Sequence, residues 1–408
     1  MSLLVSPLKL RELGILGMNN RNIGFIGRYN QRKNYCLADN KLKTKSAAIA
    51  RGIAVPELIG TVDYQFQVST LNKLLEERDA FVIKPSQGSG GKGILVIVGR
   101  RGDKFIKSSG ALIDDREVRR HSSNILAGLH SLGGRNDSAM IEALIDFDPI
   151  LKDYSYEGVP DIRVIVFRGV PVMAMMRCAT RSSDGKANLH QGAVGVGIDI
   201  GTGKSICAVQ NNRIVSQHPD THINFDTLTI PHWQQLLELA SGCAGMAGLD
   251  YLGVDIVLDR LRGPMLLELN ARPGLAIQVA NQAGLKHRLL KAGEIADGFF
   301  SAEGSPSAEG PPFAEGSLSA EGSLSAEGSP SAEGSPSAEG SPSADGSPSA
   351  DGSPSAEGSL SAEGSLSAEG SLSAEGSLSA EGSPSAEGSD NASQKIALAR
   401  RYFTAQTT

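Results

Sequence analysis

A six-residue unit, Ser-Ala-Glu-Gly-Ser-Pro or a close variant, runs from Ser301 to about Ser389 and limits where a core can form. The unit is rich in Ser, Gly and Pro and has too little apolar surface to offset the entropy of ordering. We therefore expect residues 301–389 to be disordered. A solenoid is the alternative for a tandem repeat, but solenoid units are longer and carry a regular apolar position, whereas here Leu alternates with Pro.

The repeat also changes how the charge of the chain is interpreted. The whole chain has 39 basic and 45 acidic side chains. The repeat contributes 15 acidic and no basic residues, and residues 390–408 contribute one acidic and three basic residues, which leaves 36 basic and 29 acidic residues in the first 300. This modest positive excess suits an anionic ligand such as a nucleotide, but it is too diffuse to indicate nucleic-acid binding.

The cysteines are scattered, and none forms a C-x-x-C pair. This argues against a disulfide framework and a zinc site, and it favours a reducing cytoplasm. No apolar run approaches the roughly 20 residues of a membrane-spanning helix, and the N-terminus lacks the zones of a signal peptide. We expect a cytoplasmic protein without membrane insertion, and we leave its oligomeric state open, a homo-oligomer included. The cysteines are Cys36, Cys178, Cys207 and Cys243.

Pairs of strand-like segments alternate with helical segments in the first 300 residues. Three pairs have the pattern of β-hairpins: residues 80–84 with 94–98, 161–167 with 170–176, and 252–258 with 265–269. Antiparallel hairpins mixed with helices predict an α+β fold rather than a doubly wound parallel sheet. Helices are expected at residues 41–51, 70–78, 234–247, 277–283 and 286–299, a further strand at 138–142, and a short amphipathic helix, marginal in isolation, at 394–405.

The densest motif is the glycine-rich segment Gln87–Gly93. Gly88, Gly90 and Gly93 satisfy G-x-G-x-x-G, but the dinucleotide-binding form of this motif must open a helix, and here it opens a strand. A glycine-rich hairpin can nevertheless fold its backbone N–H groups over phosphates, with positive charge from lysines on either side. An ordinary glycine-rich turn is an equally good interpretation of the loop taken alone.

A second glycine-rich segment, residues 198–205, ends like a phosphate-binding Walker A loop. That motif requires a glycine at its first position, where this chain has Ile198. We therefore interpret the segment as a turn.

Three oxygen-bearing side chains fall on the third predicted hairpin. Asp255 lies in one strand, and Glu268 and Asn270 lie in the other, two positions apart and therefore on one face. Two carboxylates and an amide oxygen form a hard ligand set that suits Mg²⁺. Acidic groups within an apolar strand context are costly unless they are paired or bound to a metal, which favours a site over an ordinary surface hairpin.

These pieces occur in the order of a known family. The motifs are Lys41–Lys45, Val82–Pro85 with its glycine loop, Ile141–Leu144, Asp161–Val164, Asn188–Gly192, Gly253–Asp255 and Glu268–Gly274. Together they resemble the RimK-type α-L-glutamate ligases of the ATP-grasp superfamily, most closely a short RimK-related branch, over about residues 11 to 298. Longer members carry a full N-terminal domain, whereas here about 40 residues precede Lys41, and Lys186 stands where they usually have Arg.

The resemblance implies an ATP-grasp fold, in which two α+β subdomains grip ATP, and it implies a role for each matching residue. Lys84 and Lys41 would contact the phosphates under the loop residues Gly88, Ser89, Gly90, Gly91, Lys92 and Gly93. Glu142, Ala143 and Leu144 would form the hinge that holds adenine and ribose, and Asp161, Lys186 and Asn188 would complete the nucleotide pocket. Asp255, Glu268 and Asn270 would hold Mg²⁺, with Mn²⁺ as an alternative, and Arg163 and Arg177 would act as catalytic residues that face the substrate carboxylate.

The resemblance also implies a domain organisation and a reaction. We expect a reduced N-terminal segment (1–40), an N-terminal ATP-grasp subdomain (41–135), a C-terminal subdomain with the metal site (136–300), the repeat (301–389) and a short tail (390–408). The enzyme would use ATP to activate a carboxylate as an acyl phosphate, and an amino acid such as glutamate would then attack it to form an amide. The partner carboxylate would belong to a peptide, a protein or a small molecule. The alternatives are a nucleotide-binding regulatory pseudoenzyme and a scaffold that acts through the repeat.

Overall fold

The computed structural model describes residues 6–88, 90–302 and 387–404, together with short strands between residues 313 and 380. The chain divides into two units, one of Met1–Ala292 with Ile396–Thr408 and the other of Gly293–Lys395. The first unit contains two antiparallel sheets and the candidate site, and it is described first.

The smaller sheet of this unit has six strands in the order β1-β6-β2-β3-β4-β5. Apolar side chains of alternate strand positions, Phe81 and Ile83 among them, are fully buried together with side chains of α7 such as Val118 and Ile125. The β2–β3 hairpin carries the glycine loop at its turn, as predicted. The strands are β1 (Leu58–Val62), β2 (Phe81–Pro85), β3 (Leu95–Arg101), β4 (Lys104–Lys107), β5 (Leu112–Ile113) and β6 (Ala139–Ala143).

Strand β6 lies between β1 and β2 in this sheet, so the sheet extends beyond residue 135, where we expected the first subdomain to end. The helix α7 (Asp115–Leu126) precedes it and begins with a capping box, in which Asp114 accepts from the backbone of Glu117 and Glu117 accepts from the backbone of Asp114. This sequence signal was not used in the prediction.

The larger sheet has seven strands in the order β11-β10-β9-β8-β7-β12-β13. Every residue of β7 is buried, which explains why its sequence is almost continuously apolar. Arg168 and Gly169 join β7 to β8 with positive φ angles of 52° and 77°, the conformation of a two-residue hairpin turn. The strands are β7 (Asp161–Phe167), β8 (Val170–Cys178), β9 (Val194–Ile198), β10 (Ser205–Gln210), β11 (Arg213–Val215), β12 (Tyr251–Asp259) and β13 (Gly263–Asn270).

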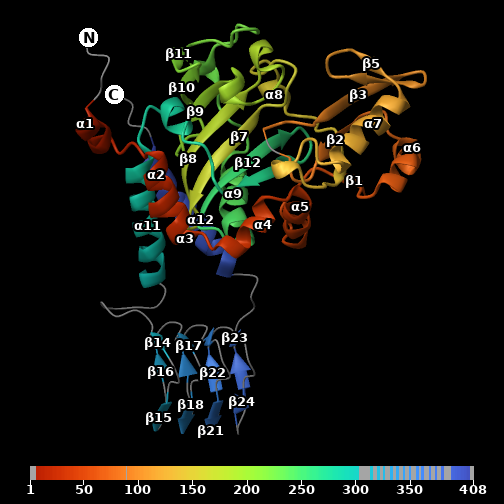
Figure 1. Cartoon of the computed structure of the whole chain (residues 1–408). Helices are drawn as coiled ribbons and strands as arrows, with labels where there is room; N and C mark the ends of the chain where they lie inside the picture. The colour runs from red at the N-terminus through yellow and green to blue at the C-terminus, as the bar shows by residue number, and fades with distance from the viewer. Residues whose placement is uncertain are drawn as a thin grey trace. The chain divides into compact units, whose positions relative to one another are not determined.

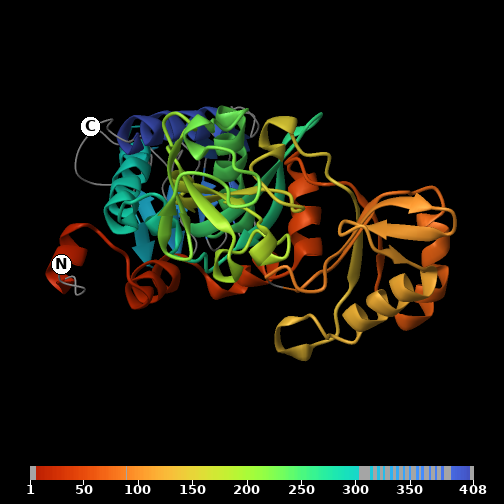
Figure 2. The same cartoon turned by 90° about the horizontal axis from the view of Figure 1, so that it is seen from above.

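Helices cover the sheets and connect them (Figures 1 and 2). Helix α9 packs on the central strands of the larger sheet, and α5 contacts both α9 and β13. None of the described helices has the length and apolar character that crossing a bilayer would need. The longer helices are α5 (Lys41–Ala50), α9 (Trp233–Ala247), α11 (Leu285–Ala302) and α12 (Glu387–Phe403), and the short helices α6 (Leu71–Leu75), α8 (Pro149–Lys152) and α10 (Ile277–Ala280) have four or five residues each.

Short helical segments make up the first 40 residues and several connections. A π-helical segment, η1 (Arg21–Ile26), directly follows the helix that ends at Asn20 and directly precedes the one that begins at Gly27. The others before residue 40 are α1 (Pro7–Glu12), α2 (Met18–Asn20), α3 (Gly27–Tyr29), η2 (Arg32–Asn34) and α4 (Tyr35–Ala38). The later 3₁₀ turns are η3 (Gln65–Thr70), η4 (Leu132–Gly134), η5 (Arg181–Ser183), η6 (Leu189–Gln191) and η7 (Phe225–Thr227).

The C-terminal helix α12 docks on the first unit through its last two turns. Ile396, Ala399 and Phe403 are buried, and Arg400 donates from Nε to the carbonyl oxygen of Gly201 at 2.8 Å. Gly201 lies in the segment that resembles a Walker A loop, and this segment is the turn between β9 and β10, as we interpreted it. Docking supplies the packing that the predicted tail helix would lack in isolation.

Within the second unit, the described residues of the repeat are twelve strands of two or three residues, from β14 (Phe313–Glu315) to β25 (Leu378–Ala380). They pair in parallel with strands three repeat units further on, for example Phe313 with Ser331. Most of residues 301–389, for which we expected disorder, lies outside the described residues.

The predicted α+β class is confirmed, since both sheets of the first unit are antiparallel and mixed with helices. All three predicted hairpins form. The strands β1, β4, β5, β9, β10 and β11 were not predicted.

Candidate functional site

The strand register of the larger sheet places a row of charged residues side by side. Arg177 of β8 is opposite Asp161 of β7, and two positions along β7 Arg163 is opposite Asp255 of β12. Asp255 is in turn opposite Glu268 of β13. Because side chains alternate between the faces of a strand, Asp161 and Arg163 point to the same face. Four neighbouring strands thus contribute to one cluster.

The two arginines of this cluster bind carboxylates in fork geometry. Arg163 donates from Nε and Nη2 to the two oxygens of Asp255 at 2.7 and 2.6 Å. Arg177 donates in the same way to Asp161 at 2.5 and 2.7 Å, and its Nη2 also reaches Asp255 at 2.7 Å. The two predicted catalytic arginines therefore use their Nε and Nη2 groups to bind the protein's own carboxylates. The sequence did not indicate this.

Burial and charge act differently on the two aspartates. Burial raises the pKa of Asp161 to about 6, against the opposing effect of Arg177, and the negative charge of Asp255 adds to the increase. Burial also disfavours the charged form of Asp255, which has no exposed surface, but Arg163 and Arg177 outweigh it and lower its pKa. Asp255 is thus held as a carboxylate in a buried, positively charged surrounding.

The predicted metal ligands come together on β12 and β13. Asn270 donates from Nδ2 to Asp255 at 3.1 Å, so its carbonyl oxygen is the atom left to accept. The side chain of Glu268 is 31% exposed and can be reached from solvent. Among the described residues, no three His, Cys, Asp or Glu side chains gather in a metal-binding arrangement, and here the third oxygen comes from an amide. Two carboxylates and an amide are the ligand types of a hard cation such as Mg²⁺, but both oxygens of Asp255 already accept from Arg163 and Arg177, so the accessible carboxylate of the set is that of Glu268.

The glycine loop requires glycine for its backbone. Gly90, Gly91 and Gly93 have φ angles of 63°, 73° and 75°, in the left-handed region that side chains disfavour. A Cβ atom on Gly93 would also lie 2.5 Å from the ring of His130. Ser89 lies outside the described residues. The loop is therefore a specific backbone conformation, although its glycine content alone also fitted an ordinary turn.

The tip of the loop faces the segment that was predicted to complete the nucleotide pocket. A Cβ on Gly90 would lie 3.9 Å from Nδ2 of Asn188, and a Cβ on Gly91 would lie 3.9 Å from the side chain of Lys186. Lys186 also forms an ion pair with Asp184 at 2.9 Å. The structure thus brings together two segments, from β2–β3 and from the turn after β8, that are about 100 residues apart in the sequence.

The stem of the loop is held by Asp137, a residue that sequence reasoning missed. Its carboxylate is buried and accepts from the hydroxyls of Ser86 and Ser131, both at 2.6 Å, and from the backbone N–H of Gln87 at 3.1 Å. The N–H of Ser138 donates to it at 2.8 Å. Asp137 therefore ties the end of β2 to the start of β6. No motif contains it, and only its burial reveals the role.

Lys41 connects the two halves of the site. Asn40 caps the N-terminus of α5 by accepting from the N–H groups of Leu42 and Lys43, which fixes the first turn of the helix. From this turn, Lys41 donates from Nζ to the carbonyl oxygen of Gly88 at 2.6 Å and lies 3.5 Å from Oε2 of Glu268. One ammonium group thus joins the glycine loop to the candidate metal ligands.

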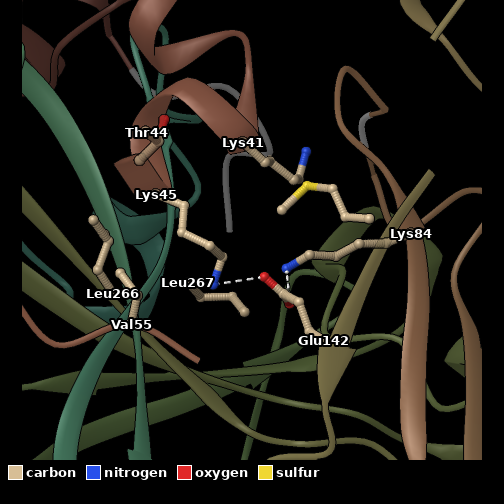
Figure 3. Close-up of a pocket in the computed structure, with 9 residues that line it drawn as sticks. Lys41, Thr44, Lys45, Val55, Lys84, Glu142, Leu266 and Leu267 are labelled. Carbon is tan, nitrogen blue, oxygen red and sulfur yellow. Dashed lines mark ion pairs between the residues drawn. The ribbon is translucent and has the colours of Figure 1, made fainter. Parts of the chain in front are cut away.

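A pocket of about 210 Å³, counted up to its opening, lies between the two sheets beside Lys41 (Figure 3). At its base, Glu142 forms ion pairs with Lys45 at 2.8 Å and with Lys84 at 2.5 Å. The side chains of all three are less than one tenth exposed. The lining residues are Lys41, Thr44, Lys45, Val55, Lys84, Met140, Glu142, Leu266 and Leu267.

The two lysines keep Glu142 charged. Burial opposes the carboxylate form of Glu142, but Lys84 and Lys45 outweigh burial and lower its pKa. Burial lowers the pKa of Lys45, against the effect of Glu142. Two lysines pair with Glu142 and a third, Lys41, also lines the pocket, so its lining has a net positive charge, which suits an anion. Lys45 belongs to the motif Lys41–Lys45, but the sequence alone does not indicate this role.

The residues of the predicted adenine hinge, Glu142, Ala143 and Leu144, lie at the end of β6 and just beyond it. The carboxylate of Glu142 points to the lysines, and the N–H of Ala143 donates to the carbonyl oxygen of Glu57 at 3.0 Å. Leu144 directly follows β6. The hinge role of these three residues stays a prediction. Leu144 is the one of them that lies outside β6.

Comparison with known proteins identifies similar sequences and structures. The model of the family described as Sugar-transfer associated ATP-grasp matches residues 20–294, about two thirds of the chain. No curated protein matches the sequence.

Among solved structures, the chain is similar to the ATP-grasp ligase PsnB complexed with minimal precursor (14% identity, 66% of this chain and 64% of that chain, TM-score 0.36). It is also similar to D-cycloserine synthetase DcsG (15%, 72% and 81%, 0.38) and to the D-alanine-D-alanine ligase from Coxiella burnetii (13%, 65% and 55%, 0.36). The chain spans less than two thirds of the length of the PsnB structure. At these values, function has to be argued from the site itself.

Proposed function

Because this chain belongs to the sugar-transfer associated ATP-grasp family, we propose that it is an ATP-dependent ligase that joins a carboxylate to an amine. The carboxylate substrate is activated by ATP as an acyl phosphate, and an amino acid such as glutamate supplies the amine. The acceptor is a carboxylate of a peptide, a protein or a small molecule. The RimK-related branch, with its glutamate specificity, belongs to this proposal.

The observation that carries the proposal is the position of Lys41. Its ammonium lies within 2.6 Å of the glycine-loop carbonyl of Gly88 and 3.5 Å from Glu268. The glycine loop would cover the phosphates of a nucleotide, and the oxygens of β12 and β13 would hold a cation, so the two parts of such a site have to lie close together. A glycine-rich turn and an acidic hairpin with unrelated roles would have no reason to share one lysine.

In the proposed reaction, the side chains act mainly by positioning and by charge. Lys41, Lys45 and Lys84 hold the phosphate groups, and the N–H groups of the glycine loop, those of Gly90, Gly91 and Gly93 among them, close over them. Asp255, Glu268 and Asn270 would hold Mg²⁺, with Mn²⁺ as an alternative, and the cation would neutralise charge that develops on the phosphates. Arg163 and Arg177 keep Asp255 ionised, and their Nη1 groups are what the fork geometry leaves for the substrate carboxylate.

The chemistry proceeds in two displacements. The carboxylate oxygen attacks the γ-phosphorus of ATP, the bond to the β-phosphate oxygen breaks, and ADP leaves with the electron pair. The amine nitrogen then attacks the acyl carbon, an N–H proton is lost, and inorganic phosphate leaves. Both steps gather negative charge at one place, which the positive residues of the pocket stabilise, and a closed loop keeps water from the acyl phosphate.

An ADP-release assay with Mg-ATP tests this proposal. A panel of amino acids is combined with a panel of carboxylates, and the double variant Asp255→Ala/Glu268→Ala serves as the background. We expect at least one pair of substrates to stimulate ADP release well above that background. If no pair exceeds the double variant, the ligase proposal fails.

A nucleotide-binding regulatory pseudoenzyme is the second candidate. It is favoured by the commitment of Lys84 to Glu142 at 2.5 Å, which leaves this lysine less free to bind a phosphate. Nucleotide binding measured by calorimetry separates the two candidates. Tight ADP binding without turnover on any substrate pair would favour the pseudoenzyme.

A further inference from the structure

The N-terminal segment carries large apolar side chains that are exposed to solvent. Residues 6–13 leave the rest of the unit as a short arm that carries α1, and both views place α1 at the margin of the unit, away from the two sheets (Figures 1 and 2). No residue of α1 is buried. The exposed side chains are Leu8 (69%), Leu10 (39%), Leu13 (54%), Ile15 (37%), Met18 (64%) and Ile23 (77%).

The N-terminal segment is nevertheless attached to the rest of the unit by hydrogen bonds. Leu16 is buried, its N–H donates to Oε1 of Gln278 at 2.8 Å, and Nε2 of Gln278 donates back to its carbonyl oxygen at 3.1 Å. The carbonyl oxygen of Gly14 accepts from the N–H of Lys286 at 2.9 Å. A Cβ on Gly14 would overlap the ring of His287 in α11, so the chain at Gly14 packs tightly against this helix. The arm is therefore fixed at residues 14–16 and presents its apolar side chains from a defined base.

The charge of the same segment is mostly positive. Residues 8–23 hold three basic side chains and one acidic side chain, Glu12, and Nη1 of Arg21 donates to the carbonyl oxygen of Pro273 at 2.8 Å; three more basic residues follow up to residue 33. The first two basic residues alternate with the leucines of α1. A surface that is both apolar and basic fits a partner that is apolar and anionic. The basic residues are Lys9, Arg11, Arg21, Arg28, Arg32 and Lys33.

The spacing of the apolar residues decides between two kinds of partner. A helix that docks in the groove of a protein presents its anchors at i, i+3, i+4 and i+7. Leu8 and Leu10 are two residues apart, which places them on opposite sides of a helical turn, and Leu13 and Ile15 lie beyond the end of α1, where Gly14 has a φ of 68°, so no single helical face carries all four. A protein groove would cover one side and leave the other in water. Acyl chains at a bilayer surface can surround both sides.

We propose that residues 8–23 bind the surface of an anionic phospholipid bilayer, with the apolar side chains at the boundary between headgroups and acyl chains and the basic side chains at the phosphates. The contact is interfacial and does not span the membrane, in agreement with the absence of a spanning helix among the described residues. It would hold the ligase body beside a membrane. The proposal does not rest on the ligase activity, because none of these residues belongs to the candidate site.

Vesicle flotation with the full chain tests the proposal. Vesicles of phosphatidylcholine alone are compared with vesicles that also contain phosphatidylglycerol. We expect the wild type to float with the anionic vesicles and to be released by salt. The variant Leu8→Glu/Leu13→Glu/Met18→Glu should bind at least ~10-fold more weakly, because burying apolar side chains at the interface drives this mode of binding.

Two further variants keep the test specific. Leu261→Glu/Ile214→Glu changes apolar side chains that are equally exposed (81% and 69%) but lie outside the arm, and it should bind like the wild type. Lys9→Gln/Arg11→Gln should lose about fivefold per basic residue on anionic vesicles only. The proposal is overturned if the wild type ignores anionic vesicles or if the control variant loses as much as the arm variant. It is also overturned if the arm variant only dissociates a dimer in sedimentation velocity.

Discussion

The two halves of the candidate site hold their charges in different ways. In the seven-stranded sheet, strand register places Arg163, Arg177 and Asp255 in contact, and all three are nearly or fully buried. In the six-stranded sheet, the glycine loop is fixed at its stem by Asp137, while Gly90 at its tip is exposed. One half is thus nearly or fully buried throughout, and the other is held at both ends, since Nε2 of His121 also lies 3.0 Å from the carbonyl oxygen of Gly93, and it is exposed at its tip. This is the arrangement expected of a rigid charge cluster beneath a loop that closes.

The largest effect should come from breaking the buried cluster. Asp255→Asn removes the charge that two buried guanidinium groups share, and leaving such a charge uncompensated costs about 3–5 kcal/mol of unfolding free energy. Asp146→Asn is the matched control, because Asp146 pairs with Arg260 where both side chains are more than half exposed, and it should cost at most about 1 kcal/mol. Urea unfolding measures both. Equal costs would mean that the cluster is not the rigid half.

An intermediate effect should come from the stem of the loop. Asp137→Ala leaves two buried or half-buried hydroxyls and two backbone N–H groups without their acceptor, so we expect the KM for ATP to rise ~10-fold with kcat changed less than about twofold. Asp137→Asn keeps an oxygen acceptor and should recover part of the loss. Asp148→Ala, which removes the N-cap of α8, is the control and should leave KM unchanged. A fall in kcat with constant KM would contradict a positioning role.

A change of pH should affect the stability contributed by Glu142 and Asp255 in one direction and that contributed by Asp161 in the other. The pKa values of Glu142 and Asp255 lie below their ordinary values of 4.5 and 3.8, so their contribution to stability is complete above those values and is lost as the pH falls through the lowered ones. The raised pKa of Asp161 has the opposite sign, and its contribution is lost as the pH rises from 3.8 to about 6. We expect the Tm to fall below pH 4.5. A Tm that is constant from pH 6 to pH 3 would contradict these ion pairs.

The smallest effect should follow from removing the repeat. Replacement of residues 304–386 by a short Gly/Ser linker keeps α11 and the docked turns of α12, whose buried side chains belong to the first unit. We expect ADP release and Tm to change by less than the error between preparations. A loss of activity would show that the second unit contributes to the site and would favour the scaffold hypothesis.

Much of the site could be predicted because strands carry its residues. Asp255, Glu268 and Asn270 sit on a hairpin whose pairing follows from apolar patterning, so their approach could be inferred from alternation alone. The ATP-grasp part of the predicted resemblance is confirmed by the family match, whereas the RimK-related branch stays a prediction.

The rest of the site depends on contacts between segments far apart in the sequence. Nothing in the motif that contains Lys45 indicates that it shares Glu142 with Lys84, and Asp137 belongs to no motif. The engagement of Arg163 and Arg177 by the protein's own carboxylates also escaped, because side-chain partners on neighbouring strands depend on register to within one residue. Glycines at alternate positions weaken the strand pattern of β9, and β11 has only three residues.

The central claim is that the glycine loop and the oxygens of β12 and β13 form one nucleotide site that uses a divalent cation. Calorimetric titration of ADP with and without Mg²⁺, on the wild type and on Glu268→Gln, tests it most directly. The account predicts that Mg²⁺ tightens ADP binding at least ~10-fold in the wild type and that Glu268→Gln abolishes this gain while the Tm stays close to that of the wild type. An equal gain in both proteins, or none in the wild type, would contradict the account.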